Sequence, residues 1–179
     1  MEELIKMQRE YGNSIQTSGK FDSILLNCNN SVLASFLYYK FDMIENEGIG
    51  IEYSIHVDQA ESCLSLPDIV DILGILLDNA FEYVKDFKSE KSCIKFNFYE
   101  DENGLGLTVS NPSHYRTNAD IEQMFLEGYS TKGNNRGMGL AKIKDLSEKH
   151  LVVIHVFNTT DDQINWINFK IKIGKRITT

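Results

Sequence analysis

The chain has 179 residues and a mass of 20.5 kDa, which suffices for one substantial domain with an appendage but not for two full domains. With 26 acidic and 18 basic residues the formal charge is −8, which excludes a general nucleic-acid binder because such proteins need a basic face. A phosphate-bearing small molecule is not excluded, since one helix N-terminus or glycine-rich loop binds phosphate locally.

Membrane, secretion and metal signals are missing from the sequence. No run approaches the ~18 apolar residues of a membrane-spanning helix, and the first ten residues lack the apolar core of a secretory signal. Cys28, Cys63 and Cys93 are widely spaced, so we expect neither a disulfide framework nor a zinc site. Free cysteines of this kind favour a reduced, cytosolic location.

The N-terminal third predicts a polar lead-in over residues 1–20 and one long helix over residues 21–47. Two apolar rows follow this helix, at Leu25, Val32, Phe36, Tyr39 and Met43 and at Leu26, Leu33, Leu37 and Ile44. So wide an apolar surface suggests pairing with other helices or with a second chain, whereas an ordinary core helix is the equally weighted alternative.

The remaining pattern alternates between strands and helices. Period-two alternation predicts a strand over 49–57, and Pro67 opens a helix with a long apolar stripe. Further strands are expected over 94–98, 105–109, 151–157 and 164–173, with a short helix over 119–126 and another over 139–149. Hairpins dominate the later part, so we expect an α+β two-layer sandwich with a mixed, mostly antiparallel sheet and helices on one face.

Polar residues interrupt the apolar helix that begins at Pro67. Asp78, Asn79 and Glu82 lie within it, and Asn79 and Glu82 share one face at i, i+3 spacing. An asparagine oxygen is a hard ligand that suits Mg²⁺. The alternative is that these residues only form the solvated face of the helix.

A glycine-rich stretch with two cations, Gly128 to Leu140, precedes the helix over 139–149. Glycines let the backbone approach a phosphate, and the N–H groups at a helix start point toward an anion. Lys132 and Arg136 add local positive charge in an acidic protein. The alternative is a flexible solvent loop.

These motifs carry a family resemblance. The run LLDNAFEY resembles the N box of the GHKL ATPase superfamily, and GYSTKGNNRGMGL resembles the F-box-to-second-glycine-box stretch of sensor histidine kinases, most of all the Agr-type quorum-sensing kinases. The resemblance implies a Bergerat-type sandwich over residues 48–179. It also implies a second dimerisation helix over 21–47, with a remnant of the first within 1–20.

The resemblance further implies roles for individual residues. Asn79 matches the N-box asparagine, which holds Mg²⁺ against the ATP phosphates, and Asn111 matches the position that accepts a hydrogen bond from the adenine amino group. The other ATP-binding positions that it implies are Glu82 in the N box, Phe125 in the F box, the lid residues Thr131, Lys132 and Arg136, and the second glycine box with Gly137, Met138, Gly139 and Leu140.

Three features depart from the family pattern. Ile75 stands where many relatives carry a polar residue, and Asn111 is followed by Pro112 rather than by the glycines of a DxGxG motif. No histidine precedes His56, so the phosphoacceptor histidine is expected outside this chain.

The resulting hypothesis is the ATP- and Mg²⁺-dependent catalytic part of a two-component sensor histidine kinase. Such a kinase transfers the γ-phosphoryl group to a histidine for relay to a response regulator, works as a homodimer, and lies on the cytoplasmic side of a bacterial membrane through an N-terminal sensor. A nucleotide-binding scaffold without catalysis and an anti-sigma-type serine kinase remain alternatives.

Overall fold

The computed structural model describes residues 20–87, 93–126 and 138–176. Its elements in chain order are α2 (Asp22–Asn27), α3 (Ser31–Asn46), β1 (Gly50–His56), α4 (Leu66–Phe87), β2 (Cys93–Asp101), β3 (Gly104–Pro112), α5 (Asn118–Met124), α6 (Gly139–Lys149), β4 (Val152–Asp161) and β5 (Ile164–Gly174). From β1 onward this order is the one that the hydrophobic periodicity predicts.

The five strands form one mixed sheet in the order β1-β2-β3-β5-β4. β1 runs parallel to β2, and the other neighbouring pairs are antiparallel. The parallel pair needs a crossover, which α4 supplies, whereas short turns join the later strands. The predicted mixed, mostly antiparallel sheet is therefore confirmed.

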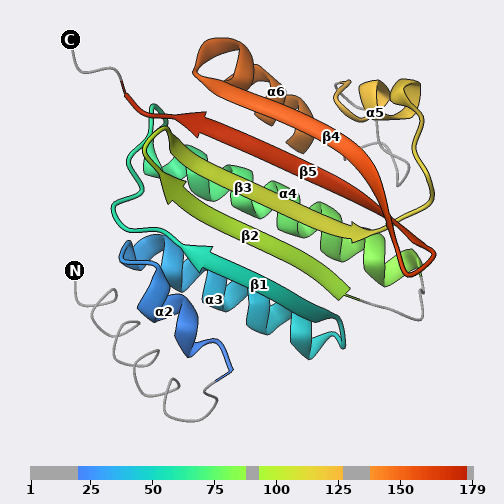
Figure 1. The fold of residues 1–179 in the computed structure, drawn as a ribbon, viewed down its shortest axis with the longest axis horizontal. Helices are drawn as coiled ribbons and strands as arrows, with labels where there is room; N and C mark the ends of the chain where they lie inside the picture. The colour runs from blue at the N-terminus through green and yellow to red at the C-terminus, as the bar shows by residue number, and fades with distance from the viewer. Residues whose placement is uncertain (1–19, 88–92, 127–137, 177–179) are drawn as a thin grey trace.

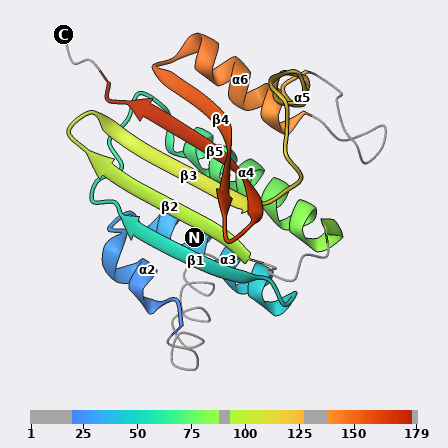
Figure 2. The same ribbon diagram turned by 45° about the vertical axis from the view of Figure 1, so that its right-hand side comes forward.

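Helices α3, α4 and α6 cover one face of this sheet (Figures 1 and 2). The arrangement is an α+β two-layer sandwich, as the sequence predicts. Within the described ranges, no helix is both long enough and apolar enough to span a membrane.

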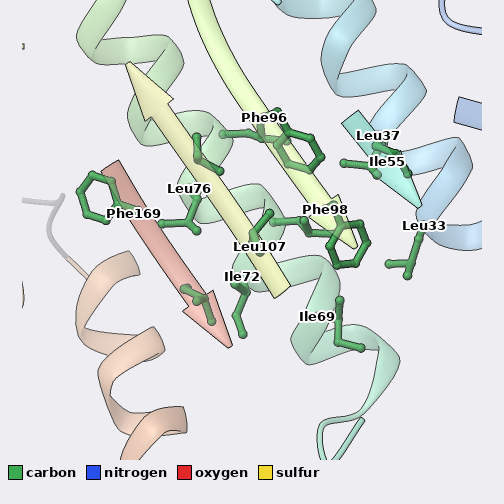
Figure 3. Close-up of a cluster of buried hydrophobic side chains, with 14 of the residues drawn as sticks. Leu33, Leu37, Ile55, Ile69, Ile72, Leu76, Phe96, Phe98, Leu107 and Phe169 are labelled. Carbon is green, nitrogen blue, oxygen red and sulfur yellow. The ribbon is translucent and has the colours of Figure 1, made fainter. Parts of the chain in front are cut away.

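The core lies between the two layers (Figure 3). Alternate residues of β2 and β3, such as Phe96, Phe98 and Leu107, face the buried stripe of α4 at Ile72 and Leu76, and each of these side chains is at most 2% exposed. Because these residues recur with period two on the strands and at threes and fours on the helix, each element buries one continuous apolar face.

The long helix that the sequence predicts before the sheet is confirmed as α3. Its predicted continuity over residues 21–47 is wrong, because the chain leaves α2 at Cys28 and starts α3 at Ser31. Cys28 forms an isolated parallel bridge with Val57 beyond the end of β1. Asn30 then caps α3, its side-chain oxygen accepting a hydrogen bond from the Leu33 N–H at 3.2 Å. Pairing with a strand distant in sequence thus overrides the local helical periodicity.

Along α3 the two apolar rows have different environments, whereas Leu26 of the second row lies in α2 and is 78% exposed. Leu33, Leu37 and Ile44, from the second row, are fully buried against the sandwich core, so α3 is a core helix along this side. From the first row, Val32 and Tyr39 are each 51% exposed. The dimerisation role and the domain boundary at residue 47 stay predictions.

Candidate functional site

The polar residues that interrupt the apolar stripe of α4, Asp78, Asn79 and Glu82, point to different sides of the helix. Lys40 of α3 forms an ion pair with Asp78, with 2.7 Å between Nζ and Oδ1, and the lysine side chain is only 15% exposed. Asp78 is therefore a structural partner of α3. Asn79, the next residue, is exposed, and Glu82 is half-buried.

The face of α4 that carries Asn79 is directed toward α6. Asp71 accepts a hydrogen bond from Lys142 of α6, and a Cβ atom built on Gly139 would lie 2.9 Å from Cγ2 of Ile75. Positions 71, 75 and 79 follow one another at i, i+4 spacing on one side of a helix. Asn79 therefore lies one turn, roughly 6 Å, beyond the contact between Ile75 and the start of α6.

The start of α6 presents backbone N–H groups for which its N-cap residue provides no side-chain acceptor. Met138 occupies the N-cap position and makes no side-chain cap hydrogen bond, while its carbonyl accepts from the Lys142 N–H at 3.0 Å. The first N–H groups of a helix have no acceptor within the helix, and the helix dipole is positive at this end. The first turn of α6, next to Asn79, is thus suited to hold an anion.

Gly139 is the residue that permits this close approach of α6 to α4. Any side chain at position 139 would crowd Ile75, so the glycine requirement here arises from packing as well as from access to the backbone. Ile75, a departure from the family pattern at the level of sequence, is accordingly part of the contact that positions the α6 N-terminus.

Asn111 lies at the end of β3, 2% exposed and paired with Ile167 of β5. Its side-chain nitrogen donates to the Pro112 carbonyl at 2.9 Å. This bond uses one of the two N–H groups of the amide, and the side-chain oxygen is the acceptor that Asn111 can offer to a ligand.

The segment after β3 is held to α4 and to the β4–β5 hairpin. The Ser113 N–H donates to the Asn165 carbonyl at 2.8 Å, and the Arg116 N–H donates to Oδ1 of Asn158 at 3.0 Å. In turn, Nδ2 of Asn158 donates a hydrogen bond to the Arg116 carbonyl at 2.8 Å. On the other side, the His114 N–H and the Arg116 guanidinium both donate to the Tyr83 hydroxyl, at 3.4 Å and 3.2 Å.

Helix α5 begins directly after this segment with a capping box. Thr117 and Asp120 exchange hydrogen bonds between side chains and backbone, which lowers the pKa of Asp120. Phe125, the predicted F-box residue, follows α5 as its C-terminal cap and is half-buried. Glu122 and Gln123 supply the carbonyls that its N–H approaches.

Those predicted site residues that the structure describes divide into three groups, and Glu82 belongs to the first, on α4 close after Asn79. Asn79, Met138, Gly139 and Leu140 lie close together where α4 meets α6, and Asn111 lies at the β3 end, which the bonds to Tyr83 connect to the C-terminal part of α4 (Figure 1). Phe125 is at the end of α5. Thr131, Lys132, Arg136 and Gly137 fall outside the described residues.

Sequence reasoning missed two residues of this region, Tyr83 and Arg116. Tyr83 stands four residues after Asn79 and so shares its side of α4, a signal that was present in the sequence. Arg116 contacts Tyr83 at a separation of 33 positions along the chain, which no local pattern reveals.

The oxygen ligands around Asn79 suit Mg²⁺ only when a nucleotide supplies further ligands. Among the described residues, no group of three or more His, Cys, Asp or Glu side chains is placed to hold a metal ion. Asp78 is committed to Lys40, whereas Asn79 offers a neutral amide oxygen. Mg²⁺ prefers oxygen ligands, keeps several waters and is commonly shared with substrate phosphates, so these residues fit that mode of binding.

A hollow of about 650 Å³ lies at the C-terminal end of β2, away from Asn111, and offers no alternative phosphate site. Acidic side chains line much of it, namely Asp58, Glu61, Glu100, Asp101 and Glu102. Their charges repel a phosphate.

Comparison with known proteins identifies the family. Residues 64–174, more than half of the chain, match the model of the GHKL domain family. Sensor protein CitS from Bacillus subtilis (strain 168) is 37% identical over 84 residues, which make up 46% of this chain and 15% of CitS. The chain therefore matches only a small part of that relative's length.

Several solved structures of histidine kinases share this fold. The catalytic domain of histidine kinase ThkA has a TM-score of 0.60 at 16% identity and covers 82% of this chain and 91% of its own. Full-length ShkA in complex with AMPPNP has a TM-score of 0.57 at 15% identity, over 82% of this chain and 30% of its own. The mycobacterial sensor histidine kinase MprB has a TM-score of 0.56 at 14% identity, and the match covers 81% of this chain and 96% of the MprB chain.

At identities this low, the structural likeness shows the shared fold alone. The match over residues 64–174 establishes the family. The chain belongs to the GHKL domain family.

Proposed function

We propose that this chain is the ATP-binding catalytic part of a two-component sensor histidine kinase. The observation that carries the proposal is the junction of α4 and α6, where Gly139 lies against Ile75, one helical turn before Asn79, and the N-cap residue Met138 provides no side-chain cap. An exposed amide oxygen next to a positive helix end suits a magnesium-bound polyphosphate.

In this proposal the nucleotide spans from the α6 start to the end of β3. Asn79 holds Mg²⁺, the first-turn amides at Gly139 and Leu140 bind phosphate oxygens, and Asn111 accepts a hydrogen bond from the adenine amino group. Glu82 and Phe125 border the site, and Thr131, Lys132, Arg136 and Gly137 complete it. Bound Mg²⁺ would neutralise phosphate charge during phosphoryl transfer.

The chemistry needs positioning rather than a strong base in this domain. Transfer of the γ-phosphoryl group depends mainly on alignment and charge neutralisation, and a histidine on another segment supplies the nucleophile. The phosphorylated histidine would then serve a response regulator. We further propose that the intact protein is a homodimer at the cytoplasmic side of a membrane, and the Agr-type likeness stays a prediction.

Titration calorimetry with Mg·ATP tests the proposal. The chain should bind Mg·ATP, and Asn79→Ala should weaken binding about tenfold or more, because the metal loses its protein ligand. Asn97→Ala is the matched control, since Asn97 is also exposed but lies on a strand, and it should bind like the unmodified chain.

A scaffold without nucleotide chemistry predicts a different result. If the unmodified chain shows no binding at millimolar Mg·ATP, the proposal is wrong and the scaffold alternative stands. Equal affinities for the Asn79→Ala and Asn97→Ala variants would remove the assigned role of Asn79.

A further inference from the structure

Arg116 packs its guanidinium group against an aromatic ring of α4. Its Nη2 donates to the Tyr83 hydroxyl at 3.2 Å, and its Cζ lies 5.5 Å from the centre of the Tyr83 ring. This places a planar cation on the side of α4 that also carries Asn79 one turn earlier.

The guanidinium retains unused hydrogen-bonding capacity. Its Nε is buried and has no hydrogen-bond partner within the part of the chain that the structure describes. Asp120 is close enough for Arg116 to lower its pKa, yet the Asp120 carboxylate already accepts two hydrogen bonds from Thr117.

The backbone of Arg116 is fixed independently of its side chain. The reciprocal hydrogen bonds with Asn158 involve only the Arg116 N–H and carbonyl groups. Because the anchoring does not depend on the guanidinium, the side chain is separable from the task of holding this segment in place.

The location of the guanidinium distinguishes it from a phosphate ligand. Along α4, the Gly139 contact lies at Ile75, Asn79 is one turn further, and Tyr83 with Arg116 is one turn beyond that. The α6 start and Arg116 are therefore about two helical turns, ~12 Å, apart along the axis of α4. A nucleotide whose phosphates lie at the α6 end brings its base, not its phosphates, to Arg116.

We propose that Arg116 binds the base of the nucleotide, its flat guanidinium stacking on a purine while Tyr83 supports it from the α4 side. Guanidinium groups stack on aromatic planes, and arginine contributes in this way where proteins hold bases. The inference rests on the proposed function, and it adds a base-contacting residue that no sequence motif marks.

Binding of adenosine and of Mg·ATP to Arg116→Gln, Arg116→Lys and the unmodified chain tests this inference, with calorimetry for Mg·ATP and displacement of a fluorescent ATP analogue for adenosine. Arg116→Gln should weaken both ligands by the same factor, about fivefold, because both carry the base. Arg116→Lys, which keeps the charge but loses the plane, should weaken them less. The melting temperature without ligand should stay within about 2 °C, because the backbone anchor remains.

Lys95→Gln is the matched control, since it also removes a cation from an aromatic ring. The Nζ atom of Lys95 lies 4.3 Å from the centre of the Trp166 ring. Because Ile94 and Phe96 are buried, strand alternation places Lys95 on the other face of the sheet, so its loss should leave both affinities unchanged.

Two outcomes would overturn the inference alone. Unchanged adenosine affinity in Arg116→Gln would show that the base does not contact the guanidinium, and a loss confined to Mg·ATP would assign Arg116 to the phosphates. If Asn79→Ala still weakens Mg·ATP in either case, the proposed function survives. Absence of Mg·ATP binding by the unmodified chain would overturn both.

Discussion

Two ends of the molecule present clusters of backbone N–H groups, and they are satisfied in different ways. In the loop between β1 and α4, the N–H groups of residues 58–61 all donate to the Glu100 carboxylate, at 2.9 to 3.1 Å. At the α6 start, Met138 provides no side-chain acceptor for the first turn. Within the described residues, the chain thus supplies its own anion at one end, whereas the N-cap residue of α6 supplies none at the other.

This difference separates a structural anion site from a ligand site. Ala60 in the Glu100 loop has a φ of +57°, a left-handed conformation that is unfavourable for alanine and that the four bonds to one carboxylate hold in place. The α6 start instead adjoins Asn79, an exposed residue with an oxygen that suits a metal. We therefore expect changes at Glu100 to affect folding and changes at α6 to affect nucleotide binding.

Removal of the internal anion should have the largest effect on stability. Glu100→Ala leaves four N–H groups without their charged acceptor and should lower the free energy of unfolding by about 2 kcal/mol in a denaturant titration. Its affinity for Mg·ATP should not change. Glu102→Ala, at an exposed acid two residues away, should cost less than ~0.5 kcal/mol. Equal losses for the two variants would show that the carboxylate cluster, rather than the four bonds, matters.

The same carboxylate makes stability depend on pH. Partial burial raises the pKa of Glu100, but the four backbone N–H donors outweigh this effect and hold the pKa below its ordinary value of 4.5. A lowered pKa in the folded state contributes stability that is present above pH 4.5 and is lost as the pH falls toward the folded-state pKa. As the pH is lowered from 6, the free energy of unfolding should therefore fall less steeply for Glu100→Gln than for the unmodified chain. Parallel curves would contradict the assignment.

Crowding of the α4–α6 contact should affect binding more than stability. Gly139→Ala places a methyl group against Ile75, which should shift the α6 start and weaken Mg·ATP by about 1 kcal/mol, or roughly fivefold. The double variant Gly139→Ala/Ile75→Ala should recover part of that affinity, since it removes the crowded atoms. Failure of the second change to restore any affinity would mean that Gly139 acts through its backbone alone.

The ion pair that links α6 to α4 should have the smallest effect. Asp71 raises the pKa of Lys142 through their hydrogen bond, but the pair is about half exposed on both sides. Surface pairs of this kind contribute little to stability. Lys142→Met should leave thermal unfolding and Mg·ATP affinity unchanged within error, and a clear loss of affinity would assign Lys142 to the ligand.

Much of the fold follows from periodicity in the sequence. The period-two runs and the apolar stripe after Pro67 predict β1 to β5 and α4, and Gly139 marks the first residue of α6. The break at Cys28 was missed because Val57, its pairing partner, lies 29 positions away. The asparagine at position 30 is a typical N-cap and is the local signal that was available.

The site is less accessible from sequence than the fold. Motifs indicate Asn79 and Gly139 because the spacing within one helix, or at its start, carries the information. Tyr83, Arg116 and Asn158 are brought together by contacts across 33 and 42 positions, which depend on the sheet order. The packing of Ile75 on Gly139 likewise requires both helices to be placed.

The most direct test of the two-end comparison is an amide NMR titration of the chain with Mg·ATP. We predict large shift changes for the amides of Gly139, Leu140 and Ala141 and for the Asn79 side chain, and none for the amides of residues 58–61, which Glu100 already holds. Unchanged signals at the α6 start, or changes centred on the Glu100 loop, would contradict the proposal that the α4–α6 junction binds the nucleotide.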